Sequence, residues 1–430
     1  MSSTWFRNPV RHPRGRQTQG AVVSMLEGFR ILDCSGEPGF LAGKILGDMG
    51  ADVVKLESPG GDVDRRGPYL GGIEDPERSL VWLSLNTSKR GITLDLESQR
   101  GCDLFRRLVP LFDVVLESTR PGTFERWGIG FESLCATHPG LVWCAMTPFG
   151  QTGPYADYRA SDISVVAMGG NAHATGWLDR APIRCTMPTG YYHAAPEAAL
   201  GITLALYGRE DTGQGQFVDV SMREVQLQTL LSGPGQFEAD PERYADRHRA
   251  GDRIGKSREI WRVKDGYVSF GLRGGPSRIP NLKATVQWME EDGMAPQWLL
   301  EYDWAQYNHN VMGVEEFAPY EEAFGAFFAS KTMRELFEGA VDRRILLAPC
   351  NDAREISEHS QLRSRDLFVT IDYPELGASI EHPDFFAKTS RRGVRVRRPA
   401  PRIGQHNTEI YAELGLGSDE IAELREEGVL

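Results

Sequence analysis

From Phe29 onward, short continuous apolar runs alternate with segments in which apolar residues recur every three or four positions. Five runs predict strands, namely FRILD (29–33), DVVKLE (52–57), GITLDLE (91–97), DVVLES (113–118) and LVWCAM (141–146). Two segments between them predict helices, LAGKILGDMG (41–50) and SQRGCDLFRRLVPLF (98–112). This alternation predicts an α/β fold, in which a parallel sheet is covered by helices on both faces.

The pattern predicts where a ligand would bind. Ligands of open parallel sheets sit beyond the carboxyl ends of the strands. We therefore expect binding residues in four strand-end loops, which start at Cys34, Ser58, Ser118 and Thr147.

The pattern changes at both ends of this region. Residues 1–24 carry four arginines and no acidic residue, and we expect residues 1–27 to form a disordered tail outside the fold. Residues 236–257 are polar and turn-rich, which predicts a linker. Residues 258–360 combine a hairpin-like stretch, WRVKDGYVSFGLRGG, with helical segments such as YEEAFGAFFASKTMRELFEGAV, and they predict a smaller α+β domain.

Composition removes several classes of function. The formal net charge of -12 argues against a nucleic-acid partner, which requires a basic face. No apolar run approaches the roughly 18–20 residues of a membrane-spanning helix, so no membrane partner is expected. The six cysteines contain no C-x-x-C pair, which favours reduced thiols in a cytoplasmic protein without a metal site.

A dinucleotide-binding unit is the first alternative to test, because a strand, a glycine-containing turn and Glu57 follow one another as in such units. The turn CSGEPGFLAG places Gly36, Gly39 and Gly43 at spacings that do not match G-x-G-x-x-G. Without that turn, the backbone cannot approach a pyrophosphate in the required way. A nicotinamide-dependent enzyme is therefore disfavoured.

Six stretches, in this order along the chain, resemble the class III CoA-transferase family of the CaiB/BaiF (formyl-CoA and carnitine CoA-transferase) type. They are GDMGADVVKLESPGGD, NTSKRGITLDLES, RPGTFERWGIGFESL, TPFGQTGPYADYRASD, GREDTGQGQFVDVSM and PAPRIGQHNTEI. ERSLVWLSLNTSKRGITLDL is most similar to subunits of heteromeric benzylsuccinate-type CoA-transferases.

The resemblance implies a domain arrangement. The family has a Rossmann-like large domain built from both chain ends, which here corresponds to residues 28–235 and 361–430. The smaller domain, residues 258–360, is inserted between them. Two chains interlock, so the resemblance implies a dimer.

The resemblance also implies coenzyme A, bound as an acyl-CoA substrate, and three residues that contact it. Arg126 matches a nucleotide-contacting arginine, Arg159 falls where a basic residue meets the CoA phosphates, and Leu94 falls where an apolar residue flanks the adenine. The alternative is that the two arginines are solvated surface charges and that Leu94 is a core residue. Ser58 and Glu97 depart from the basic residues of some members, so the adenine end of the site is expected to differ.

The most consequential departure concerns the nucleophile. The family uses one Asp near the start of the helix that here begins around MPTGYYHAA, and Tyr191 occupies its position. A carboxylate is suited to covalent acyl transfer because its acyl anhydride is reactive, whereas a phenol cannot form a mixed anhydride. The related racemases place a His where this chain has Ser161 and an Asp at the Tyr191 position, so racemisation is disfavoured.

Four other side chains are candidate substitutes. Glu37, in the first strand-end loop, is the most plausible alternative carboxylate. Glu197 follows Pro196 and is better explained as an acid in the first turn of a helix that starts at Pro196. Asp162 is expected to be structural, and His193 is either a general base or a histidine packed at a helix start.

These observations lead to a primary hypothesis and two alternatives. The chain is predicted to be one subunit of a heteromeric CoA-transferase that moves CoA from an acyl-CoA to a small carboxylic acid. An Asp-bearing paralogous subunit would supply the nucleophile; a homodimer is the other expected assembly. The alternatives are a non-catalytic acyl-CoA-binding or scaffolding subunit, and a single-chain acyl-CoA transferase or lyase that uses Glu37.

Overall fold

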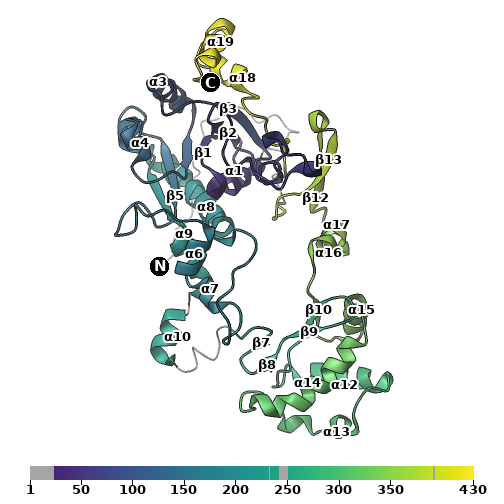
Figure 1. Ribbon diagram of the computed structural model, residues 1–430. Helices are drawn as coiled ribbons and strands as arrows, with labels where there is room; N and C mark the ends of the chain where they lie inside the picture. Colours follow the sequence, from purple (N-terminus) through teal and green to yellow (C-terminus); the bar gives the residue numbers. More distant parts are fainter. Residues whose placement is uncertain (1–23, 232, 242–249, 391–392) are drawn as a thin grey trace, which may run out of the picture.

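The computed structural model describes residues 24–231, 233–241, 250–390 and 393–430 (Figure 1). The predicted tail, residues 1–27, lies outside the described residues as far as residue 23. Residues 24–27 were predicted to belong to this tail, but Leu26 is buried in the core and its N–H donates to the carbonyl of Met49 at 2.9 Å. The fold therefore includes residues 24–27, where one apolar side chain was too weak a signal in the sequence.

The predicted α/β fold is confirmed by a six-stranded sheet with the order β3-β2-β1-β4-β5-β6, in which every pair of neighbours is parallel. Its strands are β1 (Arg30–Cys34), β2 (Asp52–Glu57), β3 (Lys89–Thr93), β4 (Val114–Glu117), β5 (Val142–Thr147) and β6 (Phe217–Ser221). Four of the first five lie where continuous apolar runs predicted them, whereas β3 begins two residues before the predicted run at 91–97 and ends at Thr93. The strand order reverses between β1 and β4, and such a switch point leaves a crevice at the carboxyl ends of the strands.

Helices cover both faces of this sheet because successive strand side chains point to opposite faces. Leu32 and Val115 pack with α3 (Gln99–Leu108), whereas Ile31 and Val114 pack with α1 (Glu37–Asp48) and α8 (Thr189–Thr212). The remaining helices of this part are α2 (Leu80–Leu85), α4 (Thr123–Arg126), α5 (Phe131–Cys135), α6 (Asp162–Met168), α7 (Asn171–Ala174), α9 (Met222–Leu227) and α10 (Gly233–Ala239).

A separate apolar cluster gathers only residues between Trp261 and Leu347, and Figure 1 shows this part of the chain below the sheet. Its elements are β9 (Ile260–Arg262), β10 (Tyr267–Ser269), β11 (Ala348–Pro349), α12 (Ile279–Glu291), α13 (Gln297–Leu300), α14 (Val314–Ala329) and α15 (Met333–Arg343). Within the segment predicted as a linker, the structure has the end of α10 and the short pair β7 (Arg253–Ile254) and β8 (Ser257–Arg258); residues 242–249 lie outside the described residues.

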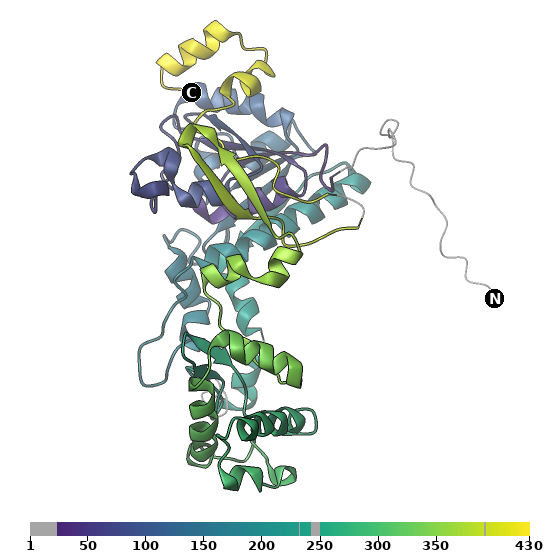
Figure 2. The same cartoon turned by 90° about the vertical axis from the view of Figure 1, so that its right-hand side faces the viewer.

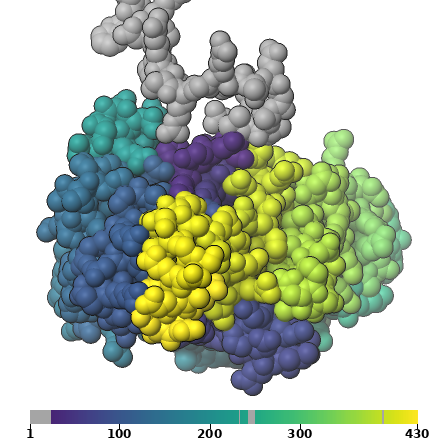
Figure 3. Space-filling model, turned by 90° about the horizontal axis from the view of Figure 1, so that it is seen from above, coloured from purple at the N-terminus to yellow at the C-terminus, as the bar shows by residue number. Residues whose placement is uncertain are grey.

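The chain then returns to the sheet. Its last elements are α16 (Ala353–Glu358), α17 (Ser360–Ser364), the hairpin β12 (Phe368–Tyr373) and β13 (Ala378–Pro383), α18 (Asn407–Ala412) and α19 (Ser418–Glu426). The hairpin lies in front of the sheet in Figure 2, and the yellow C-terminal segment lies beside the purple first part of the described chain in Figure 3. None of the helices in the described part of the chain is both long and apolar enough to cross a membrane.

This returning segment protects the open edge of the sheet. Thr93, at the end of edge strand β3, donates its N–H to Asn407 Oδ1 at 2.9 Å and accepts a hydrogen bond from Tyr411 Oη at 2.7 Å. The N–H of Gly91 donates to His406 Nδ1 at 3.0 Å. An unpaired edge invites pairing with other chains, so these contacts complete the sheet as well as stabilise it.

Candidate active site

A cavity of about 450 Å³ lies at the carboxyl end of β1, where the strand-end rule predicted a binding site. Five parts of the chain converge on it: the start of α1, the loop after β2, α2, the start of α6, and the segment that leads into α8. The residues that line it are Glu37, Arg66, Gly67, Pro68, Val81, Ser161, Asp162, Ile163, Arg184, Thr186, Met187, Pro188, Tyr191 and Tyr192. Glu37 and Tyr191, singled out in the sequence, thus share one cavity.

The backbone at the start of α8 is held by Asp162. One oxygen of this carboxylate, Oδ1, accepts the N–H of Gly190 at 2.7 Å and that of Tyr191 at 3.3 Å. A side chain at position 190 would place its Cβ 2.8 Å from the same oxygen, so glycine is required for this close approach. Because Asp162 occupies these two donors, they are not available to an oxyanion, and the contacts support the structural role expected for Asp162.

The helix starts seven residues before Pro196, and this corrects the prediction that Pro196 would be its first residue and Glu197 its second. Proline is favoured at the first helical position, which is the signal that misled the sequence interpretation. Here the buried alanines on both sides of Pro196 pack α8 against α1 and the sheet, and this packing outweighs the lost backbone hydrogen bond. Glu197 and His193 line a neighbouring pocket of about 380 Å³.

Tyr191 is half-buried and its side chain is uncharged at neutral pH. Burial raises the pKa of the Tyr191 phenol above its ordinary value of 10, and the nearby carboxylate of Glu37 adds to the increase. Burial and the carboxylate of Glu37 also raise the pKa of the Tyr192 phenol. Position 191 therefore carries a neutral phenol, which cannot be acylated to an anhydride.

Glu37 supplies a carboxylate to the same cavity, but it is paired. It is the first residue of α1 rather than a loop residue, it is 8% exposed, and its N–H donates to Asp64 Oδ2 at 2.8 Å. Its carboxylate accepts a hydrogen bond from the guanidinium of Arg66. Burial raises the pKa of Glu37, and Arg66 opposes that increase.

The three residues matched to CoA contacts lie outside this cavity. Arg126 is exposed on α4 and donates to Thr123 Oγ1 at 2.8 Å, and Arg159 is exposed just before α6. Leu94 is only 1% exposed and belongs to the core on one face of the sheet, a placement that favours the core reading. Arg120, in the loop after β4, is 52% exposed and lies 3.9 Å from Asp157. It is another cation at this edge that the sequence analysis did not consider.

A buried ion pair that the sequence analysis did not identify lies next to the turn that precedes Glu37. Lys89 and Asp33 are both fully buried, and Lys89 Nζ donates to Asp33 Oδ2 at 2.7 Å. The other oxygen of Asp33 accepts the N–H of Ser35 at 3.0 Å and so fixes the turn that precedes Glu37. Burial lowers the pKa of Lys89 to about 8.

A second buried pair fixes the loop after β2. Arg65 donates two hydrogen bonds to Glu57, at 2.6 and 2.9 Å, and its guanidinium lies 3.6 Å from the ring centre of Trp82. The next residue, Arg66, lines the cavity and contacts Glu37 there.

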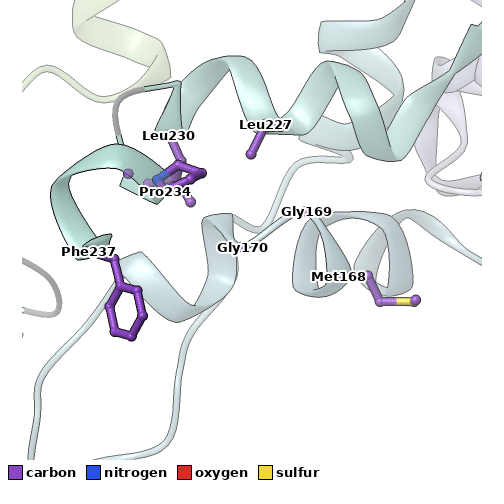
Figure 4. Close-up of a pocket in the computed structure, with 8 residues that line it drawn as sticks. Met168, Gly169, Gly170, Leu227, Leu230, Pro234 and Phe237 are labelled. Atoms are coloured by element: carbon purple, nitrogen blue, oxygen red, sulfur yellow. The ribbon is translucent and has the colours of Figure 1, made fainter. Parts of the chain in front are cut away.

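Another pocket, of about 300 Å³, lies between α6, α7 and the α9–α10 segment (Figure 4). Its lining consists of glycines and apolar residues, among them Met168, Leu230 and Phe237. It contains no ionisable group, so we place the chemistry in the cavity around Tyr191.

The chain is similar to known proteins over most of its length. The model of CoA-transferase family III matches residues 26–407. The chain is 31% identical over 404 residues to succinyl-CoA:(R)-benzylsuccinate CoA-transferase subunit BbsE of Thauera aromatica, covering 94% of this chain and 97% of that protein. It is 32% identical over 416 residues to succinyl-CoA–D-citramalate CoA-transferase of Chloroflexus aurantiacus, covering 94% and 98%.

Solved structures share the fold. A CAIB/BAIF family protein from Brucella suis superposes with a TM-score of 0.75 at 24% identity, covering 91% of this chain and all of that one. Rv3272 from M. tuberculosis gives a TM-score of 0.70 at 23% identity with the same coverage. The family match across the chain and these relatives establish that the protein is an enzyme of CoA-transferase family III.

Proposed function

We propose that this chain is one subunit of a heteromeric CoA-transferase that moves CoA from an acyl-CoA to a carboxylic acid. The observation that carries the proposal is the neutral phenol of Tyr191 at the start of α8, inside a cavity that otherwise retains charged groups. The nucleophilic Asp would come from a paralogous subunit. Similar proteins include subunits by name, such as the beta subunit of succinyl-CoA–L-malate CoA-transferase of Chloroflexus aurantiacus, 28% identical over 417 residues.

The proposed assembly is an interlocked dimer in the cytoplasm. Residues 258–360 would form the inserted domain, and residues 28–235 with 361–430 the large domain. The contacts of Asn407 and Tyr411 with Thr93 support the assignment of the last segment to the large domain. Residues 236–257 would then connect the two domains.

Acyl-CoA is proposed to lie along the carboxyl ends of the strands. The exposed guanidinium groups of Arg126 and Arg159 are suited to the phosphates of CoA, since arginine binds phosphate through several N–H donors. Leu94 offers almost no exposed side chain, so its proposed contact with the adenine requires the core to open locally.

The proposed chemistry divides the work between two subunits. The partner's carboxylate attacks the thioester carbonyl, the C–S bond breaks, and CoA leaves as the thiolate while an acyl anhydride remains. The acceptor's carboxylate then attacks the partner's carbonyl in this anhydride, and the donor acid leaves as its carboxylate. The thiolate attacks the acceptor's carbonyl in the new anhydride, which forms the new thioester and frees the partner's carboxylate. In this chain Asp162 fixes the backbone of α8 and Tyr191 fills the nucleophile's position.

Two preparations test the proposal. The chain alone and the chain with an Asp-bearing family member are assayed for transfer of CoA from succinyl-CoA to a carboxylic acid. We expect transfer only from the pair. Full activity of the isolated chain would count against a borrowed nucleophile, and activity of neither would favour the alternative of an acyl-CoA-binding subunit.

A gain-of-function variant tests whether the cavity itself is competent. Tyr191→Asp restores a carboxylate at the family position, and we expect an acyl adduct that hydroxylamine converts to a hydroxamate at residue 191. Tyr192→Asp is the matched control, because this neighbouring residue lines the same cavity one position away. Adduct on both variants, or on neither, would show that position 191 is not the reacting position.

The second candidate is a single-chain transferase or lyase that uses Glu37. Its supporting observation is that Glu37 lies in the cavity and that burial raises its pKa. The pairing with Arg66 disfavours it, because a carboxylate held by a guanidinium is a weaker nucleophile. Peptide mapping after hydroxylamine treatment during turnover decides: a hydroxamate at Glu37 supports this candidate, and its absence excludes it.

A further inference from the structure

A buried glutamine on α9 contacts the first turn of α8. The side chain of Gln226 is completely buried, and its Nε2 donates to the carbonyl of Thr189, the first residue of α8, at 3.3 Å. The same nitrogen lies 3.2 Å from Nδ1 of His193, one turn further along α8. An amide nitrogen carries two hydrogens, so Gln226 serves both acceptors at once.

Close packing of α6 and α9 holds Gln226 in this position. Gly169 is the C-cap of α6, and a Cβ at this residue would lie 2.4 Å from Cβ of Gln226, so only glycine permits the approach. At the other end of α6, Asp162 accepts the N–H groups of Gly190 and Tyr191. The first turn of α8 is therefore held through two N–H groups by Asp162 and through one carbonyl by Gln226.

The carbonyl of Thr189 decides which way the amide of Gln226 points. A carbonyl oxygen only accepts hydrogen bonds, so the amide nitrogen rather than Oε1 must face it. Oε1 of Gln226 is buried and has no hydrogen-bond partner among the described residues, so no contact of its own favours the reverse orientation. With an N–H donor facing it, Nδ1 of His193 must be the accepting nitrogen. The proton of the neutral imidazole is therefore on Nε2.

This assignment determines what His193 offers to its surroundings. His193 lines the pocket of about 380 Å³ next to the cavity, and Tyr192 lines both. A general base needs a free lone pair, but the lone pair of Nδ1 is engaged by Gln226. What His193 has left for the pocket is the N–H donor of Nε2.

We propose that Gln226 is a positioning residue that keeps His193 in its Nε2–H form, so that His193 serves the pocket as a hydrogen-bond donor and not as a general base. Of the two roles that the sequence left open for His193, this excludes the general base. It also agrees with the proposed transfer chemistry, in which carboxylates and a thiolate attack in their ionised forms and no proton has to be removed. That agreement rests on the proposed function, whereas the tautomer of His193 does not.

Nitrogen NMR of the full-length chain, labelled with ¹⁵N in its histidines, tests the proposal. Spectra are recorded at about pH 8.5, where a histidine with the ordinary pKa is neutral, and the His193 signals are those that disappear in His193→Gln. We expect Nδ1 at the chemical shift of an unprotonated nitrogen and Nε2 at that of a protonated one, without averaging between them. Gln226→Met keeps the length of the side chain and removes the donor. In this variant the two shifts should move toward each other, because the Nδ1–H form becomes populated.

Two further variants complete the test. Gln226→Glu places an acceptor against Nδ1, so a proton should appear on Nδ1 of His193. Gln228→Glu is the matched control, because Gln228 lines the same pocket two residues away; it should leave the proton on Nε2. A protonated Nδ1 in the parent would overturn the inference, as would His193 shifts that are identical in the parent and in folded Gln226→Met. Both spectra are decisive even if the buried charge of Gln226→Glu prevents folding. Transfer activity is not measured, so this inference and the proposed function can fail independently.

Discussion

The buried pair of Lys89 and Asp33 gives the sharpest test of how the cavity is supported. We consider Lys89→Met, which keeps much of the side-chain volume and removes the charge. Lys89 Nζ makes three hydrogen bonds: to Asp33 Oδ2 at 2.7 Å, to the carbonyl of Phe40 at 2.8 Å and to Asn86 Oδ1 at 2.7 Å. All four residues are buried, so water does not replace the lost donors without opening the core.

The magnitude follows from that burial. Removing one member of a buried ion pair leaves an uncompensated charge and costs about 3–5 kcal/mol of unfolding free energy. With a urea dependence of about 2–3 kcal/mol per M, the midpoint of unfolding should fall by roughly 1–2.5 M. Urea unfolding followed by circular dichroism measures this change.

Two control variants test whether the loss of stability comes from a buried, unpaired charge. The exposed pair of Arg334 and Glu338 is formed at 2.8 Å, and Arg334→Met should leave the midpoint almost unchanged because solvent screens this pair. The double variant Asp33→Asn with Lys89→Met removes both charges and should recover much of the loss. A midpoint for Lys89→Met that matches the exposed control, or a double variant no more stable than Lys89→Met, would refute this reasoning.

Two further predictions concern the strands beside the site. Burial raises the pKa of Glu117 from 4.5 to about 7, so the folded state binds this proton more tightly than the unfolded state does. The resulting stabilisation, at most about 3 kcal/mol, is fully present below pH 4.5 and is lost as the pH rises through 7. Glu117→Gln should flatten the melting temperature between pH 4.5 and 7, and an unchanged slope would contradict the assignment. Asn407→Ala leaves the buried N–H of Thr93 without its acceptor and should cost about 1–3 kcal/mol, with faster hydrogen exchange at Thr93; unchanged exchange would show that another group protects this edge.

Local sequence patterns predicted the strands of the sheet and the position of the cavity at the strand ends. The strands are buried on both faces, so their apolar runs are continuous and stand out from the surrounding sequence. The strand-end rule likewise placed Glu37 in the region where Tyr191 also lies, because the start of α1 follows β1 directly. The resemblance placed the start of α8 around MPTGYYHAA, in agreement with Thr189, whereas Pro196 taken by itself resembles a first helical residue and lies inside the helix.

Other features depend on partners far apart in the sequence. Thr93 and Asn407 are 314 residues apart, and no local pattern indicates that one completes the sheet edge of the other. The pairing of Lys89 with Asp33 is hidden for the same reason, since a lysine in an apolar strand does not reveal its partner. Arg184 precedes α8 in a segment without periodicity, so its place in the cavity follows only from the path of that segment in three dimensions.

The charges of the cavity indicate why a tyrosine at position 191 suits a subunit that binds an acid. Its ionisable lining comprises two acids, Glu37 and Asp162, and two arginines, Arg66 and Arg184, apart from the neutral tyrosines. These four charges cancel, and an anionic acid enters a cavity without net repulsion. An Asp at position 191 would add a third negative charge beside a carboxylate, which raises the cost of holding that Asp ionised and of admitting an anion. A tyrosine at position 191 avoids that cost, which supports the proposal that a second subunit carries the nucleophile.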